Sequence, residues 1–239
     1  VTTYWLSGMS LFDAFNHGLT SIATGGFSTS DMSMGKFNDL ILMEATFFMM
    51  LGSLPFFLFV REMHGQHFVL FRDQQVRLFL AILLVVPLLL TLHRWWVSPV
   101  AFDPFHNYVS TLFNVTSVVS TSGYASEDYS AWGPLAFVAF FFLMFVGGCS
   151  GSTAGGMKIF RFQLSLIILR EQLMRLLHPR AVFTRNYNGR AVSDEIISSM
   201  IAYTFIFLLC LLIITVLLAS LQLVHNNNIQ TTTNETTNR

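Results

Sequence analysis

The chain has 239 residues, of which 53% are hydrophobic and only 11% are charged, and its formal net charge at pH 7 is zero. This composition excludes an ordinary soluble domain, and the balanced charge gives no reason to expect nucleic acid as a partner. The seven histidines have no metal-ligand spacing and no pair of carboxylates falls on one helical face, so the sequence predicts a protein that is not an enzyme.

Apolar stretches alternate with shorter, more polar segments along the chain. In order, we expect a short helix at residues 11–22, a membrane span at 40–60 interrupted by Gly52 and Pro55, a span at 76–96 containing Pro87, a short helix at 108–119, a span at 132–146, an amphipathic basic stretch at 157–177 and a span at 196–223. The two short helices cannot cross a bilayer, so we expect them to be re-entrant and to enter from the outer side.

A glycine-rich segment follows the span at 132–146. Its residues are Gly147, Gly148, Cys149, Ser150, Gly151, Ser152, Thr153, Ala154, Gly155 and Gly156. This composition makes a poor helix, so we expect an unwound loop inside the membrane. The alternative is a packed helix, because Gly147, Gly151 and Gly155 have the small-xxx-small spacing found at contacts between membrane helices.

The distribution of Lys and Arg predicts the orientation. Positive residues gather in segments 61–77 and 158–190, which we therefore expect on the cytoplasmic side. Lys158 and Arg161 serve in this interpretation as anchors at the inner surface. Tryptophan and tyrosine side chains then form an outer belt, beside acidic residues that an approaching cation would meet: Trp5, Trp95, Trp96, Tyr129 and Trp132, with Asp31, Asp39, Asp103, Glu127 and Asp128.

An internal repeat is the most informative pattern. Residues 12–31 align without a gap against residues 109–128, at a constant offset of 97. The matched pairs are Thr24 and Thr121, Gly26 and Gly123, Phe27 and Tyr124, and Asp31 and Asp128. Two re-entrant segments flanked by spans indicate a polar cavity, because backbone carbonyls at membrane depth need protein, water or an ion as partners.

The second copy, Ser120-Thr121-Ser122-Gly123-Tyr124, is close in character to the potassium-channel filter pattern Thr-Val-Gly-Tyr-Gly. Glycine reaches unusual backbone angles without steric cost, which lets successive carbonyls face one axis. We therefore expect potassium, the only metal ion predicted here, to bind backbone carbonyls in both loops. The residues concerned are Ala23, Thr24, Gly25, Gly26, Ser120, Thr121, Ser122 and Gly123.

These motifs resemble the Trk/Ktr/HKT superfamily of potassium transporters, and within it most closely the bacterial TrkH subunits. The resemblance rests on residues 20–28, 114–125 and 147–161 and extends to about Leu223. It implies an all-α integral membrane fold of helix/pore-loop/helix units of potassium-channel type, with residues 147–156 as an intramembrane gating loop. It also implies a homodimer in the bacterial inner membrane, surrounded by lipid, without a covalent cofactor, and regulated by a cytosolic nucleotide-binding ring of the TrkA type that Lys158 and Arg161 couple to the gate.

Matched to the four repeats of this family, residues 1–72 hold the pore loop and inner helix of the second repeat. Residues 73–190 hold the third repeat, with its pore loop, its broken inner helix and a basic segment. Residues 191–223 form the outer helix of the fourth repeat, and residues 224–239 form a polar tail. The expected function is potassium transport as the pore-forming subunit, and channel-like flow and ion-coupled symport both remain open. The alternative is a truncated, non-conducting subunit for membrane interaction or regulation.

Overall fold

Helices make up nearly all of the regular structure in this computed structural model, which describes residues 1–97, 103–178 and 184–237. The chain forms two units, Val1–Ala191 and Val192–Arg239. The elements of the first are α1 (Thr2–Leu6), α2 (Leu11–Ile22), α3 (Asp39–Gly52), α4 (Phe56–Met63), α5 (Val69–Arg72), α6 (Gln74–Val97), α7 (Pro104–Val119), the 3-10 helix η1 (Tyr129–Trp132), α8 (Pro134–Val146), α9 (Ile159–Leu177), β1 (Asn186–Tyr187) and β2 (Arg190–Ala191). The second unit holds α10 (Asp194–Thr237), and the expected all-α class is confirmed.

Two described helices are long and apolar enough to span a membrane, Gln74–Val97 and Asp194–Gln222. A third span results if α3 and α4 are counted together, although their axes differ by 84°. The break falls at Gly52–Pro55, as expected, because proline removes a backbone donor and disfavours helical geometry in the residue before it. Helix α8 has only 13 residues, about 20 Å at 1.5 Å per residue, so it ends inside a bilayer of ordinary thickness.

The two re-entrant segments are helices that end at the two loops. Helix α2 has the predicted bounds and is capped by Ser10, whose side chain accepts a hydrogen bond from Asp13 N. Helix α7 begins four residues before the predicted start, because Asp103 caps it and Pro104 occupies its first turn. Two residues after the end of each helix lies a threonine with positive φ, Thr24 at 48° and Thr121 at 57°.

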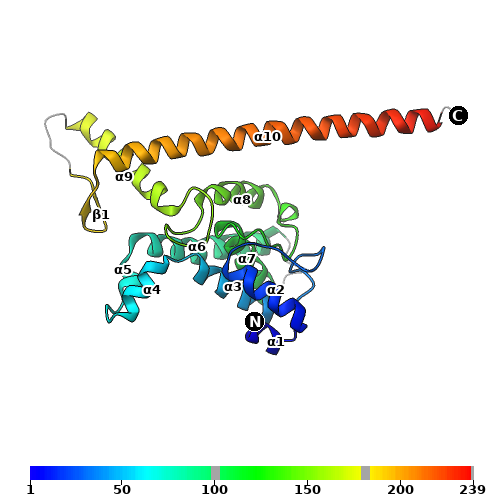
Figure 1. Cartoon of the computed structure of the whole chain (residues 1–239), viewed down its shortest axis with the longest axis horizontal. Coiled ribbons are helices and arrows are strands. Elements are labelled where there is room, and N and C mark those ends of the chain that lie inside the picture. The colour runs from blue at the N-terminus through cyan, green and yellow to red at the C-terminus, as the bar shows by residue number, and fades with distance from the viewer. Residues whose placement is uncertain (98–102, 179–183, 238–239) are drawn as a thin grey trace. The chain divides into compact units, whose positions relative to one another are not determined.

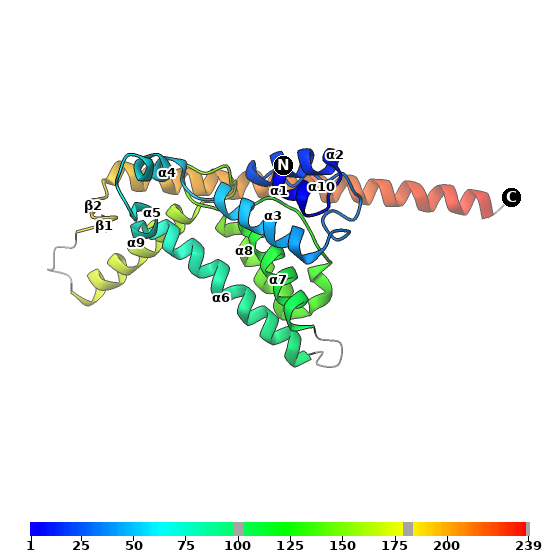
Figure 2. The same ribbon diagram turned by 90° about the horizontal axis from the view of Figure 1, so that it is seen from below.

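Helix α7 lies at the centre of the first unit, in contact with α3, α6 and α8 (Figure 1, Figure 2). It is buried although many of its residues are polar. Thr111 Oγ1 donates to the carbonyl of Asn107 at 2.6 Å and Thr116 Oγ1 to that of Leu112 at 2.7 Å, so carbonyls of the helix itself satisfy these two hydroxyls. A polar helix is thereby accommodated in an apolar interior.

Apolar side chains pack on both sides of α7. One cluster includes Phe79 and Leu83 of α6, Val115 of α7 and Phe140 of α8. The other joins α1, α2 and α3 to the opposite side of α7, and includes Tyr4, Ile41, Met49 and Phe113. Since lipid is as apolar as these side chains, close packing and not water exclusion holds the helices together at this depth.

Helix α10 is apolar around its whole circumference between Ile201 and Leu221, which is the composition of a lipid-facing or protein-covered span. The backbone of residues 224–237, expected as a polar tail, continues this helix.

Candidate ion path and gate

The two predicted loops have the same backbone conformation. Gly25 N donates to the carbonyl of Thr20 at 2.8 Å, and its counterpart Ser122 N donates to that of Ser117 at 2.9 Å. The hydroxyl of Thr20 lies 3.2 Å from the carbonyl of Phe27, as the hydroxyl of Ser117 lies 2.7 Å from that of Tyr124. Each of these pairs is related by the offset of 97 residues, so the sequence repeat is also a structural repeat.

Both repeat glycines have positive φ, Gly26 at 67° and Gly123 at 85°. Their surroundings differ. A Cβ on Gly26 would lie 1.8 Å from the carbonyl oxygen of Ser122 in the other loop, whereas a Cβ on Gly123 would meet no atom within 4 Å. The absence of a side chain at Gly26 is therefore what allows the two loops to touch.

Tyr124 joins the loops a second time. Its hydroxyl donates to the carbonyl of Phe27 at 3.3 Å and forms a hydrogen bond with the hydroxyl of Thr20. Its ring stacks on that of His17, with 5.9 Å between ring centroids. The sequence showed only an aromatic residue after the glycine, and this contact between the repeats depends on tertiary structure.

Residues 147–158 are not helical, so the unwound-loop interpretation is confirmed over the packed helix. Gly147, Gly151 and Gly156 have φ between 70° and 79°, which explains why glycine is needed there. The segment docks on the α3–α4 break: Thr153 N donates to the carbonyl of Gly52 and Cys149 N to that of Ser53, both at 3.1 Å. In return, Phe56 N donates to the carbonyl of Gly151 at 2.9 Å. Two broken helices thus satisfy each other's backbone groups.

The same segment lies against both loops. Thr121 Oγ1 accepts a hydrogen bond from Gly155 N at 2.6 Å, and Thr24 Oγ1 lies 3.3 Å from Thr153 Oγ1. The hydroxyl of Thr153 is 2.9 Å from the carbonyl of Gly52 and 3.0 Å from that of Ile22. The matched threonines of the repeat are therefore the residues that touch the glycine-rich segment.

Lys158 and Arg161 contact this segment directly. The ammonium group of Lys158 donates to the carbonyl of Ala154, and Arg161 Nη1 donates to that of Met157 at 3.2 Å. These contacts hold carbonyls that the unwound backbone leaves without helical partners. Their expected coupling to a cytosolic partner stays a prediction.

Most of the acidic residues expected to meet a cation have structural partners. Glu127 forms an ion pair with Arg94, at 3.2 and 3.3 Å from its two guanidinium nitrogens. Asp39 lies 2.7 Å from His106, while Asp103 and Asp128 cap α7 and η1.

Trp132, expected in the outer aromatic belt, is buried at 8% exposure. The guanidinium of Arg94 lies over its ring, 4.0 Å from the centroid. The protein therefore covers this ring, whereas Trp5, Trp95 and Trp96 are exposed, and the position of all four relative to the membrane stays a prediction.

Comparison with known proteins identifies the family. The family model described as "TrkH: Cation transport protein" matches residues 1–234. The chain belongs to the TrkH family.

Relatives of the chain include several Trk system proteins. The chain is 50% identical over 208 residues to the Trk system potassium uptake protein TrkI of Halomonas elongata, a match covering 86% of the chain and 42% of TrkI. It is 34% identical over 223 residues to TrkH of Vibrio parahaemolyticus, covering 87% of the chain and 44% of that protein. The chain thus spans less than half the length of these relatives.

The fold is also found among solved structures. The crystal structure of the potassium transporter TrkH from Vibrio parahaemolyticus matches with a TM-score of 0.80 and 31% identity, over 88% of this chain and 47% of that one. The expected resemblance is confirmed. The family is one of membrane transport proteins and not of enzymes.

Proposed function

We propose that this chain contributes two pore loops to the potassium path of a Trk-type uptake system. The observation that supports this most directly is the paired backbone of residues 23–26 and 120–123, with a positive-φ glycine in each loop and the loops in contact at Gly26 and Ser122. Carbonyl oxygens of these residues replace part of the hydration shell of potassium in the proposed path. The relatives named as potassium uptake proteins support the choice of ion.

Residues 147–156 form the gate in this proposal. The segment lies against the threonine of each loop and docks on the α3–α4 break, so displacing it would change the path next to the loops without altering their carbonyls. By resemblance, the full-length protein is a homodimer in the bacterial inner membrane and binds a nucleotide-sensing ring of the TrkA type. The contacts of Lys158 and Arg161 with the carbonyls of Ala154 and Met157 support a role for both residues in coupling such a partner to the segment.

A substitution at Gly123 tests the filter assignment. In a full-length protein carrying this chain, Gly123→Ala adds a methyl into open space but strains φ at 85°, at a cost of about 1–2 kcal/mol. We expect a severalfold loss of potassium-over-sodium preference in uptake by proteoliposomes, because the strain is relieved by moving the carbonyls next to it.

Gly65→Ala is the matched control, since Gly65 has φ at 83° and equally open surroundings but lies in the turn between α4 and α5. This variant should have the same backbone strain and leave the preference for potassium over sodium unchanged. Equal preference in the parent and both variants would overturn the filter assignment.

A further inference from the structure

The hairpin of β1 and β2 lies against the start of α6. Its turn consists of Asn188 and Gly189, both with positive φ, at 47° and 75°, the conformation that favours an Asn-Gly pair. Asn188 Oδ1 accepts a hydrogen bond from Gln74 N at 3.0 Å, and its Nδ2 donates to Asp73 Oδ2 at 2.8 Å. Asp73 in turn accepts from Gln75 N at 2.8 Å. The hairpin turn and Asp73 together cap α6.

One residue further, the start of α6 holds the glycine-rich segment. Gln75 is 5% exposed, and its Oε1 accepts a hydrogen bond from Ser150 N at 2.8 Å. Ser150 lies in the middle of the unwound backbone, where a buried amide without a partner would be destabilising. Gln75 thus contacts the middle of the segment, one residue away from the amide of Gln74 that Asn188 caps.

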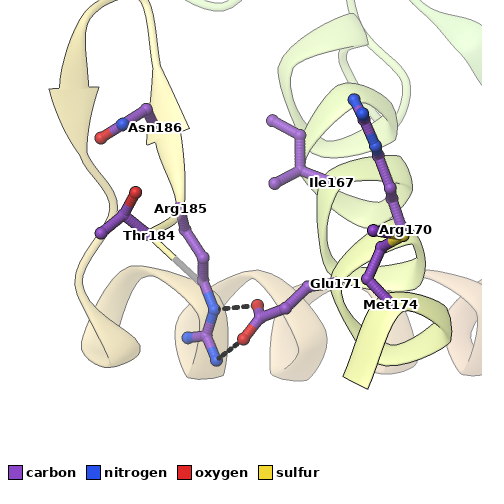
Figure 3. A pocket seen from close by; sticks show the side chains of 7 residues that line it. All are labelled: Ile167, Arg170, Glu171, Met174, Thr184, Arg185 and Asn186. Atoms are coloured by element: carbon purple, nitrogen blue, oxygen red, sulfur yellow. Dashed lines mark hydrogen bonds and ion pairs between the residues drawn. The ribbon is translucent and has the colours of Figure 1, made fainter. Parts of the chain in front are cut away.

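The hairpin is also attached to α9, the helix that leaves the segment on its other side. Arg185 binds Glu171 of α9 through two hydrogen bonds, across a cleft of about 350 Å³ between the hairpin and the helix (Figure 3). The hydroxyl of Tyr187 donates to Gln163 Oε1 at 2.5 Å, and Gln163 Nε2 donates to the carbonyl of Gln74 at 2.9 Å. One small hairpin thus contacts both α9, which follows residues 147–158, and α6, which meets them through Gln75.

We propose that Asn188 and Gln75 are positioning residues for the gate, and that the hairpin sets the position of residues 147–156 through them. A displacement of the hairpin releases the cap on α6, moves Gln75 and frees Ser150 N. This inference rests on the proposed gating role of the segment. The hydrogen bonds that carry it are independent of that role: Asn188 donates to Asp73 and accepts from Gln74 N, and Gln75 accepts from Ser150 N.

Amide hydrogen exchange at Ser150, followed by mass spectrometry on the full-length protein in nanodiscs, tests the inference. Asn188→Gly keeps the positive-φ turn and removes both side-chain hydrogen bonds, while Gln75→Met keeps the length of the side chain and removes the acceptor. We expect either variant to speed exchange of the Ser150 amide about fivefold, which corresponds to one hydrogen bond of about 1 kcal/mol. Unchanged exchange of the α7 amides shows that the fold is intact.

Asn186→Ala is the control, because Asn186 lies in the same hairpin but on the cleft beside α9 (Figure 3). It should leave exchange at Ser150 at the parent rate. If Asn188→Gly also leaves exchange of the Ser150 amide at the parent rate, the proposal that the hairpin positions the segment is wrong. If both test variants speed exchange and potassium flux stays unchanged, the positioning role holds and the gate assignment fails.

Discussion

Glycines that look equivalent in the repeat have different physical roles. Gly26 and Gly123 align at the offset of 97 residues and both have positive φ. A methyl on Gly26 would collide with the backbone of the other loop, so Gly26→Ala separates the loops, whereas Gly123→Ala only strains its own loop. Gly123 is therefore the position at which the proposed filter assignment can be tested without disturbing the contact between the repeats.

Glu171 provides a second test at the residue scale. It lies on α9, outside the two candidate spans, and its hydrogen bond from Arg185 lowers the pKa of the carboxyl group, with Arg175 adding to the effect. Because the folded pKa is below the unfolded value of about 4.3, the ionised carboxylate stabilises the fold above that value, and this stability is lost as pH falls through the folded pKa.

We expect Glu171→Gln to lower the thermal unfolding temperature at pH 7 and to differ little from the parent well below pH 4. Thermal unfolding of the parent and the variant at a series of pH values measures this. A difference between the two proteins that stayed constant across the series would show that the ionised carboxylate does not stabilise the hairpin.

At the scale of elements, the decisive contact is between two broken helices. The α3–α4 break and the segment after α8 exchange three backbone hydrogen bonds, and the hydroxyl of Thr153 reaches carbonyls of both α2 and α3. Neither break could exist alone at membrane depth, because each leaves backbone groups that lipid cannot satisfy. The segment can move only by exchanging these bonds for others.

Replacing Thr153 by valine weakens this docking without changing the shape of the side chain. In a full-length protein carrying this chain, Thr153→Val should shift the segment toward the undocked state by about fivefold, the equivalent of one hydroxyl hydrogen bond. Potassium flux should rise and its dependence on a cytosolic partner should fall, while potassium preference is retained. Flux and preference are measured in proteoliposomes, with Thr215→Val in α10 as the control. Unchanged flux with an unchanged partner response would place the barrier elsewhere.

For the whole molecule, the orientation in the membrane decides which side of the membrane the two loops face. The basic segments 61–77 and 158–190 predict a cytoplasmic face, and the exposed residues Gln66 and Ser130 lie on segments predicted to face opposite sides. An outer position for the loops requires that this orientation be correct.

Single cysteines at Gln66 and Ser130 test the orientation after the exposed Cys210 is replaced by serine, while the buried Cys149 is retained. An impermeant thiol reagent added to intact cells should label the cysteine at position 130 and should reach position 66 only after the cells are opened. Labelling of both positions from outside would reverse the predicted topology and with it the outer filter.

The sequence alone determined the class of the protein, the repeat and the places where helices break. Hydropathy determines which stretches can lie in lipid, and glycine and proline restrict the backbone locally. The bounds of α2, the break at Gly52–Pro55 and the unwound segment could therefore be predicted from neighbouring residues. Helix α7 starts four residues before its predicted position, because Asp103 caps its first turn and Pro104 fits the first helical position.

Tertiary structure decided which of these pieces meet. Gly26 touches Ser122, Tyr124 reaches Phe27, Gln75 holds Ser150 and Asn188 caps α6 across large separations in sequence. No periodicity predicts such pairs, because each depends on where the backbones of separate helices come to lie. The same holds for the contacts of Arg94, which pairs with the half-buried Glu127 and lies over the buried ring of Trp132.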